Sequence, residues 1–539
     1  NTFNHHHIRG LVGFNYEQDY QKNLYSTMMD IQSNNLNDFN LGNHTEGVSL
    51  EGGQYEWALE SFFGRVGYDW KGRYLAEVNL RWDASSRFRR DKRAAVFPSV
   101  SAGWRVSEEP FFAPIRNTFS NFKIRGSFGS LGNQAISSPY PYIQTLDLLQ
   151  QNYLVNGEFL TYASVSAPTA GNFTWETVVH GNLGLDLGFF NNRLTFAGDL
   201  YIRDTKDMLV PGKTLPGVYG AASPKENAAD LRTKGYELTL SWNDKFNLAG
   251  KPFTYGVSFA LGDNISKITK YDNPTKDFNV SQYYEGMTIG EIWGYKIDGL
   301  FKTDEEAAAY QAEIDHSLIA KNILQTATGK YKGLKAGDPK FVDLDGNGRI
   351  DDGEKTANNR GDMRVIGNSR PRYNYSGSIN LGWNGFDISA FFQGVGRQHR
   401  YPDGNAMLFW GGYARPYSSF VPEHFLDDVW SEDNPDAYFP KLRGYAAQGD
   451  RHLAKVNNRY LQNTAYCRLK NLTVGYTLPV DLTRKARIDR VRVYFSGDNL
   501  VTWTALKSKY IDPEQFSTDG SARVYPFAKT FSFGLDITF

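Results

Sequence analysis

The chain lacks the long hydrophobic runs of a helical membrane protein. No stretch of its 539 residues comes near the roughly 18 consecutive apolar residues of a membrane-spanning helix, which excludes such a helix. Cys467 is the single cysteine, so no disulfide can form within the chain. Lysine and arginine together number 59, as do aspartate and glutamate. A formal net charge of +0 therefore gives no indication of a nucleic-acid partner.

Aromatic residues and glycine are abundant instead, at 15% of the chain and 52 residues respectively. They accompany segments in which apolar and polar side chains alternate, as in 74–83, where Tyr74, Val78 and Leu80 share one face and Glu77 and Arg81 the other. Alternation with period two predicts strands that have one apolar and one polar face. In a membrane barrel the charged face must line the interior, because a charge in the hydrocarbon costs about 2–4 kcal/mol near the midplane.

Fourteen segments give this strand signal. They are 8–16, 57–70, 74–83, 96–106, 121–130, 181–189, 194–202, 233–243, 253–263, 371–383, 386–395, 465–478, 491–496 and 529–539. Short turns join several of them, for example Asn384-Gly385, whereas polar stretches at 25–55, 132–172, 265–370 and 397–463 separate others. Alternation of short turns with long loops is typical of an outer-membrane barrel. We therefore predict an all-β, transmembrane antiparallel β-barrel with long extracellular loops, and one loop helix from Thr303, which with Glu306 forms a capping box.

The C-terminal segment supports this interpretation. Apolar side chains occupy every second position from 531 to Phe539, an aromatic residue that ends the given sequence. Gly534, Ile537 and Phe539 fit the pattern by which barrel proteins are recognised for insertion into the outer membrane. A soluble sheet is the alternative for this segment, but terminal residues of soluble domains usually fray.

The sharpest local motif is a twelve-residue acidic loop at 343–354. Its spacing matches a calcium-binding loop: Asp343, Asp345 and Asn347 at positions 1, 3 and 5, the Arg349 carbonyl at 7, Asp351 at 9 and Glu354 at 12. Gly348 occupies the sharp turn. The flanking helices of an EF-hand are not evident, so we expect a structural Ca²⁺ ion that pins a long loop. The alternative is an acidic turn without an ion.

A second loop is aromatic. Phe409, Trp410, Tyr413 and Tyr417 offer flat apolar faces that can stack on sugar rings or peptide side chains of a substrate, but burial against another loop or a partner protein is the favoured interpretation. We find no constellation of His, Cys, Ser or acidic residues with catalytic spacing and no phosphate-binding glycine loop. The sequence therefore predicts neither an enzyme nor an organic cofactor.

A series of motifs resembles the SusC/RagA family of TonB-dependent outer-membrane transporters. The segments are 97–105 (FPSVSAGWR), 108–112 (EEPFF), 123–134 (KIRGSFGSLGNQ), 175–177 (WET), 182–186 (NLGLD), 204–209 (DTKDML), 234–237 (KGYE), 293–301, the acidic loop with 366–368 (IGN), and 385–394 (GFDISAFFQG). Each motif is short, but together they follow the order of the family along most of the chain.

The resemblance implies more than the residues alone predict. Family members are barrels of about 22 strands that hold an N-terminal plug, like other plugged transporters. They pair with a SusD-like surface lipoprotein and import oligosaccharides or peptides with energy delivered by TonB. Residues 1–539 are expected to be the C-terminal portion of such a barrel in outer-membrane lipid, with the plug, the TonB-contacting part and the first strands outside this chain.

Two alternatives remain open at this point. The first is a smaller porin-like barrel that acts as a passive channel. The second is a soluble β-propeller that acts as an enzyme or a sugar-binding protein.

Overall fold

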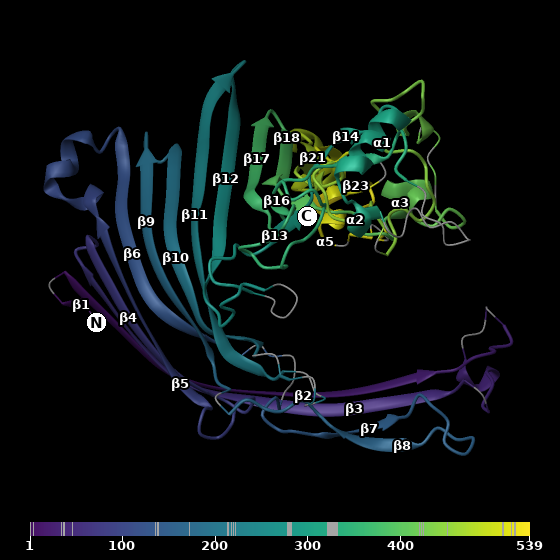
Figure 1. Ribbon diagram of the computed structural model, residues 1–539. Helices are drawn as coiled ribbons and strands as arrows, with labels where there is room; N and C mark the ends of the chain where they lie inside the picture. The colour runs from purple at the N-terminus through teal and green to yellow at the C-terminus, as the bar shows by residue number, and fades with distance from the viewer. Residues whose placement is uncertain are drawn as a thin grey trace. The chain divides into compact units, whose positions relative to one another are not determined.

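The computed structural model describes the chain except for residues 1, 4, 34, 36, 37, 46, 135, 137–139, 172, 213, 214, 217, 219, 221, 222, 278–282, 321–332, 420, 422, 424, 450, 509, 510, 519, 522, 523 and 526. The contacts within the chain divide it into two units. Figure 1 shows the strands as arrows, coloured by residue number along the chain. Unit 1 comprises 1–104, 125–181 and 203–231. Unit 2 comprises 105–124, 182–202 and 232–539.

Most of the described chain is strand, and fifteen strands belong to one sheet. They are β1 (Thr2–Phe3), β2 (His6–Thr27), β3 (Ser49–Trp70), β4 (Tyr74–Ser85), β5 (Ala94–Arg105), β6 (Phe119–Asn133), β9 (Glu176–Phe189), β10 (Leu194–Pro211), β11 (Lys225–Leu248), β12 (Lys251–Lys270), β17 (Arg372–Trp383), β18 (Phe386–Arg397), β21 (Tyr466–Thr477), β22 (Arg490–Thr504) and β23 (Thr530–Thr538). All fourteen strand predictions are confirmed, and the all-β class with them.

Consecutive strands pair in antiparallel fashion within each unit. In unit 1, β2 pairs with β3, β3 with β4 and β4 with β5. In unit 2 the order β12, β17, β18, β21, β22, β23 also follows the chain. The tight turns lie where the sequence predicts them: Asn384 and Gly385 both have positive φ, of 50° and 88°, as a two-residue hairpin turn requires.

The connections alternate between these turns and long segments with their own small elements. Their strands are β7 (Leu146–Gln150), β8 (Thr161–Val165), β13 (Glu291–Gly294), β14 (Ile297–Leu300), β15 (Pro339–Phe341), β16 (Arg364–Asn368), β19 (His399–Arg400) and β20 (Gln462–Asn463). Their helices are α1 (Asp304–Glu313), α2 (Ser317–Ala320), α3 (Met407–Trp410), α4 (Val480–Thr483) and α5 (Pro513–Thr518), with short 3₁₀ turns between them.

The predicted loop helix is α1. The Thr303 hydroxyl accepts a hydrogen bond from the N–H of Glu306 (3.1 Å), as in a capping box. The Glu306 carboxylate accepts a hydrogen bond from the backbone N–H of Lys302 (2.8 Å), whereas a capping box uses the N–H of the next residue, Thr303. None of the helices in the described ranges is long and apolar enough to cross a membrane.

One predicted loop is much shorter than expected. The sequence predicts a polar connection over 25–55, but β2 continues to Thr27 and β3 begins at Ser49, so the two strands pair over 22 residues each. The pairing of β3 with β4 begins at Leu59, which lies opposite Ser85, and the residues of β3 that precede Leu59 pair with β2 alone. The extended ribbon exposes both faces along most of its length, so no buried face marks it in the sequence.

Candidate functional site

The outward face of unit 1 is an apolar band. The register aligns Val66, Val78 and Val100 across β3, β4 and β5, and each of the three side chains is exposed. At the turn end of these strands the rings of Trp70 and Tyr74 stack with their centroids 5.5 Å apart. Tyr74 in turn stacks on Trp104 of β5, with ring centroids 6.3 Å apart. An exposed apolar band bounded by an aromatic girdle is the surface that a barrel presents to lipid.

The opposite face of the same strands carries paired charges. Arg65 lies 2.9 Å from Glu77. Arg81 donates to Asp83 at 2.7 Å and to the hydroxyl of Ser61 at 2.9 Å. These pairs place the charged side chains of β3 and β4 on one side, as the alternation predicts, and leave the lipid side free of them.

Unit 2 repeats the division. Ser258 and Ser378 share a hydrogen bond of 2.6 Å between β12 and β17, and Asn471 donates to Asp498 at 2.8 Å between β21 and β22. The pairing of β12, β17, β18, β21 and β22 aligns the polar positions of neighbouring strands, so they form one continuous face. This face carries hydroxyls and amides, which can exchange hydrogen bonds with an uncharged polar ligand. It also carries ion pairs such as Arg372–Asp263 and Arg492–Asp387.

The three residues of the expected insertion signal lie at the last strand. β23 pairs with β22, with Ile537 opposite Val491 and Gly534 opposite Tyr494. A Cβ on Gly534 would lie 2.1 Å from the Tyr494 ring, so glycine is required for this close approach. Ile537 and Phe539 are exposed. The insertion role itself stays a prediction.

The acidic loop is folded by its own side chains. The carboxylate of Asp343 accepts hydrogen bonds from the backbone N–H groups of Gly346 (2.7 Å) and Gly348 (2.8 Å). Asn347 accepts from the N–H of Arg349 at 2.8 Å. The positive φ of Gly348, 76°, supports the sharp turn that the spacing predicts.

A residue outside the predicted set completes the cluster. Asp362 is fully buried and accepts hydrogen bonds from the N–H groups of Leu344 (2.6 Å) and Asp351 (2.9 Å). One carboxylate oxygen each of Asp343, Asp345 and Asp362 lies within 4.8 Å of the others. No pattern in the sequence marks Asp362, which lies beyond the twelve-residue loop and joins it only through the fold.

The electrostatics of this cluster favour a cation. Burial raises the pKa of Asp362, and the nearby carboxylates of Asp345 and Asp343 raise it further. For Asp343, burial acts in the same direction, but hydrogen bonds from backbone N–H groups outweigh it and lower the pKa. Glu354 is exposed and is not part of the group of three.

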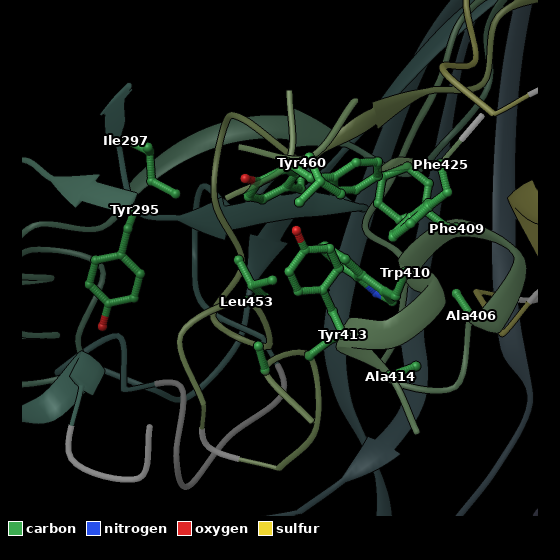
Figure 2. Packing of buried hydrophobic residues seen from close by; sticks show 14 of the residues in the cluster. Tyr295, Ile297, Ala406, Phe409, Trp410, Tyr413, Ala414, Phe425, Leu453 and Tyr460 are labelled. Atoms are coloured by element: carbon green, nitrogen blue, oxygen red, sulfur yellow. The ribbon is translucent and has the colours of Figure 1, made fainter. Parts of the chain in front are cut away.

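The aromatic loop forms the core of the long connections of unit 2. Phe409, Trp410 and Tyr413 are 3%, 0% and 0% exposed, and Figure 2 shows their rings gathered with Tyr460 and Phe425. These three side chains therefore pack inside the loops, in agreement with the favoured interpretation, and offer no surface to a ligand.

The fourth aromatic residue, Tyr417, is 78% exposed. It contacts Tyr445 with ring centroids 6.3 Å apart. Buried donors in the core are satisfied by the backbone: the indole N–H of Trp410 donates to the carbonyl of Asp403 (3.0 Å) and the hydroxyl of Tyr413 to that of Pro440. Of the four expected contact residues, only Tyr417 remains available at the surface.

Comparison with known proteins places these features in context. A family model described as TonB dependent receptor-like, beta-barrel matches residues 1–313. TonB-dependent receptor P3 of Formosa agariphila is 29% identical over 568 residues, which cover 100% of this chain and 51% of the relative. TonB-dependent receptor SusC of Bacteroides thetaiotaomicron is 29% identical over 493 residues, 89% of this chain and 44% of the relative.

A solved structure shows the same fold. The structure of the RagAB peptide transporter matches with a TM-score of 0.74 at 22% identity, covering 100% of this chain and 54% of the matched chain. The chain thus spans about half the length of the curated relatives it matches. The resemblance drawn from the sequence motifs is confirmed, and the matched relatives are receptors and transporters rather than enzymes.

Proposed function

Because the chain belongs to the TonB-dependent receptor-like β-barrel family, whose members reside in the outer membrane, we propose that it supplies the C-terminal wall and external loops of an active importer. The observation that carries this proposal is the division of wall strands such as β3, β4, β12, β17, β21 and β22 into an exposed apolar face and a hydrogen-bonded polar face. The remaining wall and the plug would come from a part of the protein outside this chain. TonB would contact that part.

We further propose that a SusD-like surface lipoprotein is its partner and that oligosaccharides or peptides are its cargo. The relative SusC and the RagAB peptide transporter support this class of complex. The hydroxyl and amide groups of the polar face in unit 2 suit either ligand, since both offer many uncharged hydrogen-bonding groups.

Uptake by cells tests the function. The full-length gene, expressed in an outer membrane with and without functional TonB, should take up a labelled peptide or oligosaccharide mixture only when TonB is present. A passive channel would admit the label equally in both strains, and this result would refute active import. A set of peptides compared with a set of oligosaccharides of matched size separates the two cargo classes.

We also propose that the acidic loop holds one structural Ca²⁺ ion. The supporting features are the ligand spacing of 343–354, the approach of the Asp343, Asp345 and Asp362 oxygens to within 4.8 Å, and the raised pKa of the buried Asp362. Ca²⁺ takes six to eight oxygen ligands at roughly 2.3–2.6 Å. Mg²⁺ fits less well, because it demands a tighter octahedron and retains its waters.

Terbium luminescence tests the site, because Tyr310 lies next to it: its hydroxyl donates to the carbonyl of Phe341 (2.9 Å). Excitation of tyrosine should give a terbium signal that Ca²⁺ displaces. Asp362→Asn should abolish the signal if the buried carboxylate is a ligand, whereas Glu354→Gln decides whether the loop also uses its twelfth position. A signal unchanged by Asp343→Asn would refute the site.

A further inference from the structure

The turn between β4 and β5 (Figure 1) carries a concentration of positive charge. Residues 86–93 contain five basic residues and one acidic residue, Asp91. Arg89, Arg90 and Lys92 are exposed, and Arg89 forms an ion pair with Asp91 in which nitrogen and oxygen lie 2.7 Å apart. The turn lies at the end of the strands where the connections are long, which in outer-membrane barrels is the external side.

Packing and hydrogen bonds fix the backbone of this turn. Phe88 is fully buried and lies against Trp175, with ring centroids 5.0 Å apart. The indole N–H of Trp175 donates to the carbonyl of Arg93 (2.8 Å). Arg87 donates to the carbonyl of Gln134 (3.2 Å). The exposed basic side chains are therefore presented by an anchored turn and not by a free loop.

A row of aromatic rings marks the outer boundary of the apolar band next to this turn. The rings of Phe14, Phe62 and Trp82 lie side by side across β2, β3 and β4, with centroids 4.9 and 5.7 Å apart. At about 3.4 Å per residue and a tilt of about 40°, the stretch of β4 from Tyr74 to Trp82 rises roughly 20 Å. An apolar band in a barrel is about 25 Å tall. Since only 83–85 separate Trp82 from the basic turn, the turn lies at the level of the lipid headgroups.

The apolar band contains a groove that adjoins this aromatic row. The groove has a volume of about 870 Å³, and residues of β2, β3, β4 and β5 line it. Gly10 and Gly64 leave space on the face of Val66. A Cβ on Gly10 would meet no atom within 4 Å, and one on Gly64 would lie 3.8 Å from its nearest neighbour, the carbonyl oxygen of Leu11. Trp82 lines the groove at the end nearest the basic turn.

A basic turn beside an apolar groove matches a lipid that has an anionic headgroup. Arginine binds phosphate through two parallel hydrogen bonds, and lysine binds it as a point charge. Basic segments at a membrane surface attract anionic headgroups. A free phosphate would need the turn alone, and an uncharged acyl chain would need the groove alone. The external leaflet of an outer membrane supplies both groups in one molecule, a phosphorylated glycolipid.

We infer that the β4–β5 turn and the adjoining groove form a binding site for one phosphorylated glycolipid of the outer leaflet. Arg90 and Lys92 would bind its phosphate, and an acyl chain would lie over Gly64 beside Trp82. The inference requires the outer-membrane location of the family but neither the proposed cargo nor the proposed partner. It gives unit 1 a specific lipid contact in addition to its general apolar face.

The test titrates the full-length transporter in detergent with fluorescent diphosphoryl lipid A. Arg90→Gln/Lys92→Gln should weaken binding roughly tenfold or more, because each removed charge weakens the attraction to an anionic headgroup. Lys71→Gln/Arg73→Gln is the matched control: it removes the same charge from the opposite end of the same strands and should bind within about twofold of the wild type. Heat-dependent mobility on SDS gels reports whether the barrel is intact. Lipid A stripped of its phosphates should not distinguish the wild type from either variant.

A second variant tests the groove without a change of charge. Gly64→Leu places a side chain in open space on the lipid face and should weaken the binding of diphosphoryl lipid A. Gly53→Leu is its control, because a Cβ there likewise meets no atom within 4 Å but lies in the part of β3 beyond the apolar band. It should keep the wild-type affinity.

A photo-crosslinking amino acid at Lys92 should capture lipopolysaccharide in cells. Capture of protein alone would overturn the inference, and so would equal affinity of the wild type and the Arg90/Lys92 double variant. Displacement of lipid A by phosphatidylglycerol at equal concentration would show a general attraction to anionic lipid and would also overturn it. Displacement by equimolar inorganic phosphate, or wild-type affinity of Gly64→Leu, would mean that the turn binds phosphate without the groove and would refute the lipid site.

Discussion

In the strands of unit 2 the large apolar side chains stay at the surface, whereas in its long connections similar side chains are buried. Val257, Ile379 and Val493 on the wall are 46%, 38% and 44% exposed. Trp410 and Tyr460 in the connections are fully buried and pack against each other with ring centroids 5.4 Å apart. The difference indicates two environments within one unit: lipid covers the wall, and water surrounds loops that carry a core of their own.

The two regions should accordingly respond to different perturbations. The wall depends on the bilayer, because its large apolar side chains are exposed at the surface and not packed in a core. The loops depend on burial of aromatic surface, as a water-soluble domain does. Each prediction below disturbs one region and uses the other as its reference.

The largest effect is expected in the loop core. Trp410→Ala removes a fully buried side chain and should destabilise the loops by about 3–5 kcal/mol. Limited proteolysis should then cleave within 397–463 while the heat-dependent gel mobility of the barrel is retained. Tyr417→Ala, at an exposed aromatic of the same loop, is the control. Loss of the barrel together with the loops would show that the two regions are not separable.

A charge on the lipid face should act on the wall alone. Val78 lies between Val66 and Val100 on the exposed apolar face, and Asn79 lies between Arg65 and Ser99 on the polar one. Val78→Arg should cost about 2–4 kcal/mol near the midplane and impair assembly, and Asn79→Arg should be tolerated. Outer-membrane yield measures both, and equal yields would argue against lipid at this face.

Acid should loosen the loops before the wall. His452 is buried with no hydrogen-bond partner for either ring nitrogen among the described residues, and burial lowers its pKa to about 4. Arg443 and Arg451 lower this pKa further, and Asp338 opposes them. The unfolded chain, with a pKa of about 6.5, binds the proton first as pH falls, so stability is lost between pH 6.5 and pH 4.

At pH 5 the loss should be roughly 2 kcal/mol relative to pH 8. Protease susceptibility of 397–463 measured across this range should rise as pH falls, and His452→Leu should flatten the profile. A wild-type profile that is already flat would mean that the imidazole titrates with its ordinary pKa in the folded loops.

The sequence predicts the wall much better than the loops, for a physical reason. A strand with one lipid face and one polar face records both in its own alternation, as at 74–83. Asp362 joins the acidic loop, and Trp410 enters the aromatic core, through contacts between segments distant in the chain. The part of β3 that precedes Trp57 exposes both faces, as β2 does along most of its length. No burial pattern in the sequence therefore indicates that the two strands extend so far.

At the C-terminal strand, the role of a residue in membrane insertion can be tested apart from its role in the stability of the folded wall. Phe539 is 85% exposed and follows the last paired residue of β23, Thr538, so its ring adds little to the packing of the folded wall. Phe539→Ser should thus leave uptake per assembled molecule and resistance to unfolding unchanged. If the residue belongs to the insertion signal, outer-membrane yield should fall nonetheless.

Thr538→Ser, which keeps the aromatic residue Phe539, is the control. Normal yield after removal of 532–539 would refute the signal, and a drop in uptake per molecule at normal yield would mean that Phe539 serves the folded wall instead.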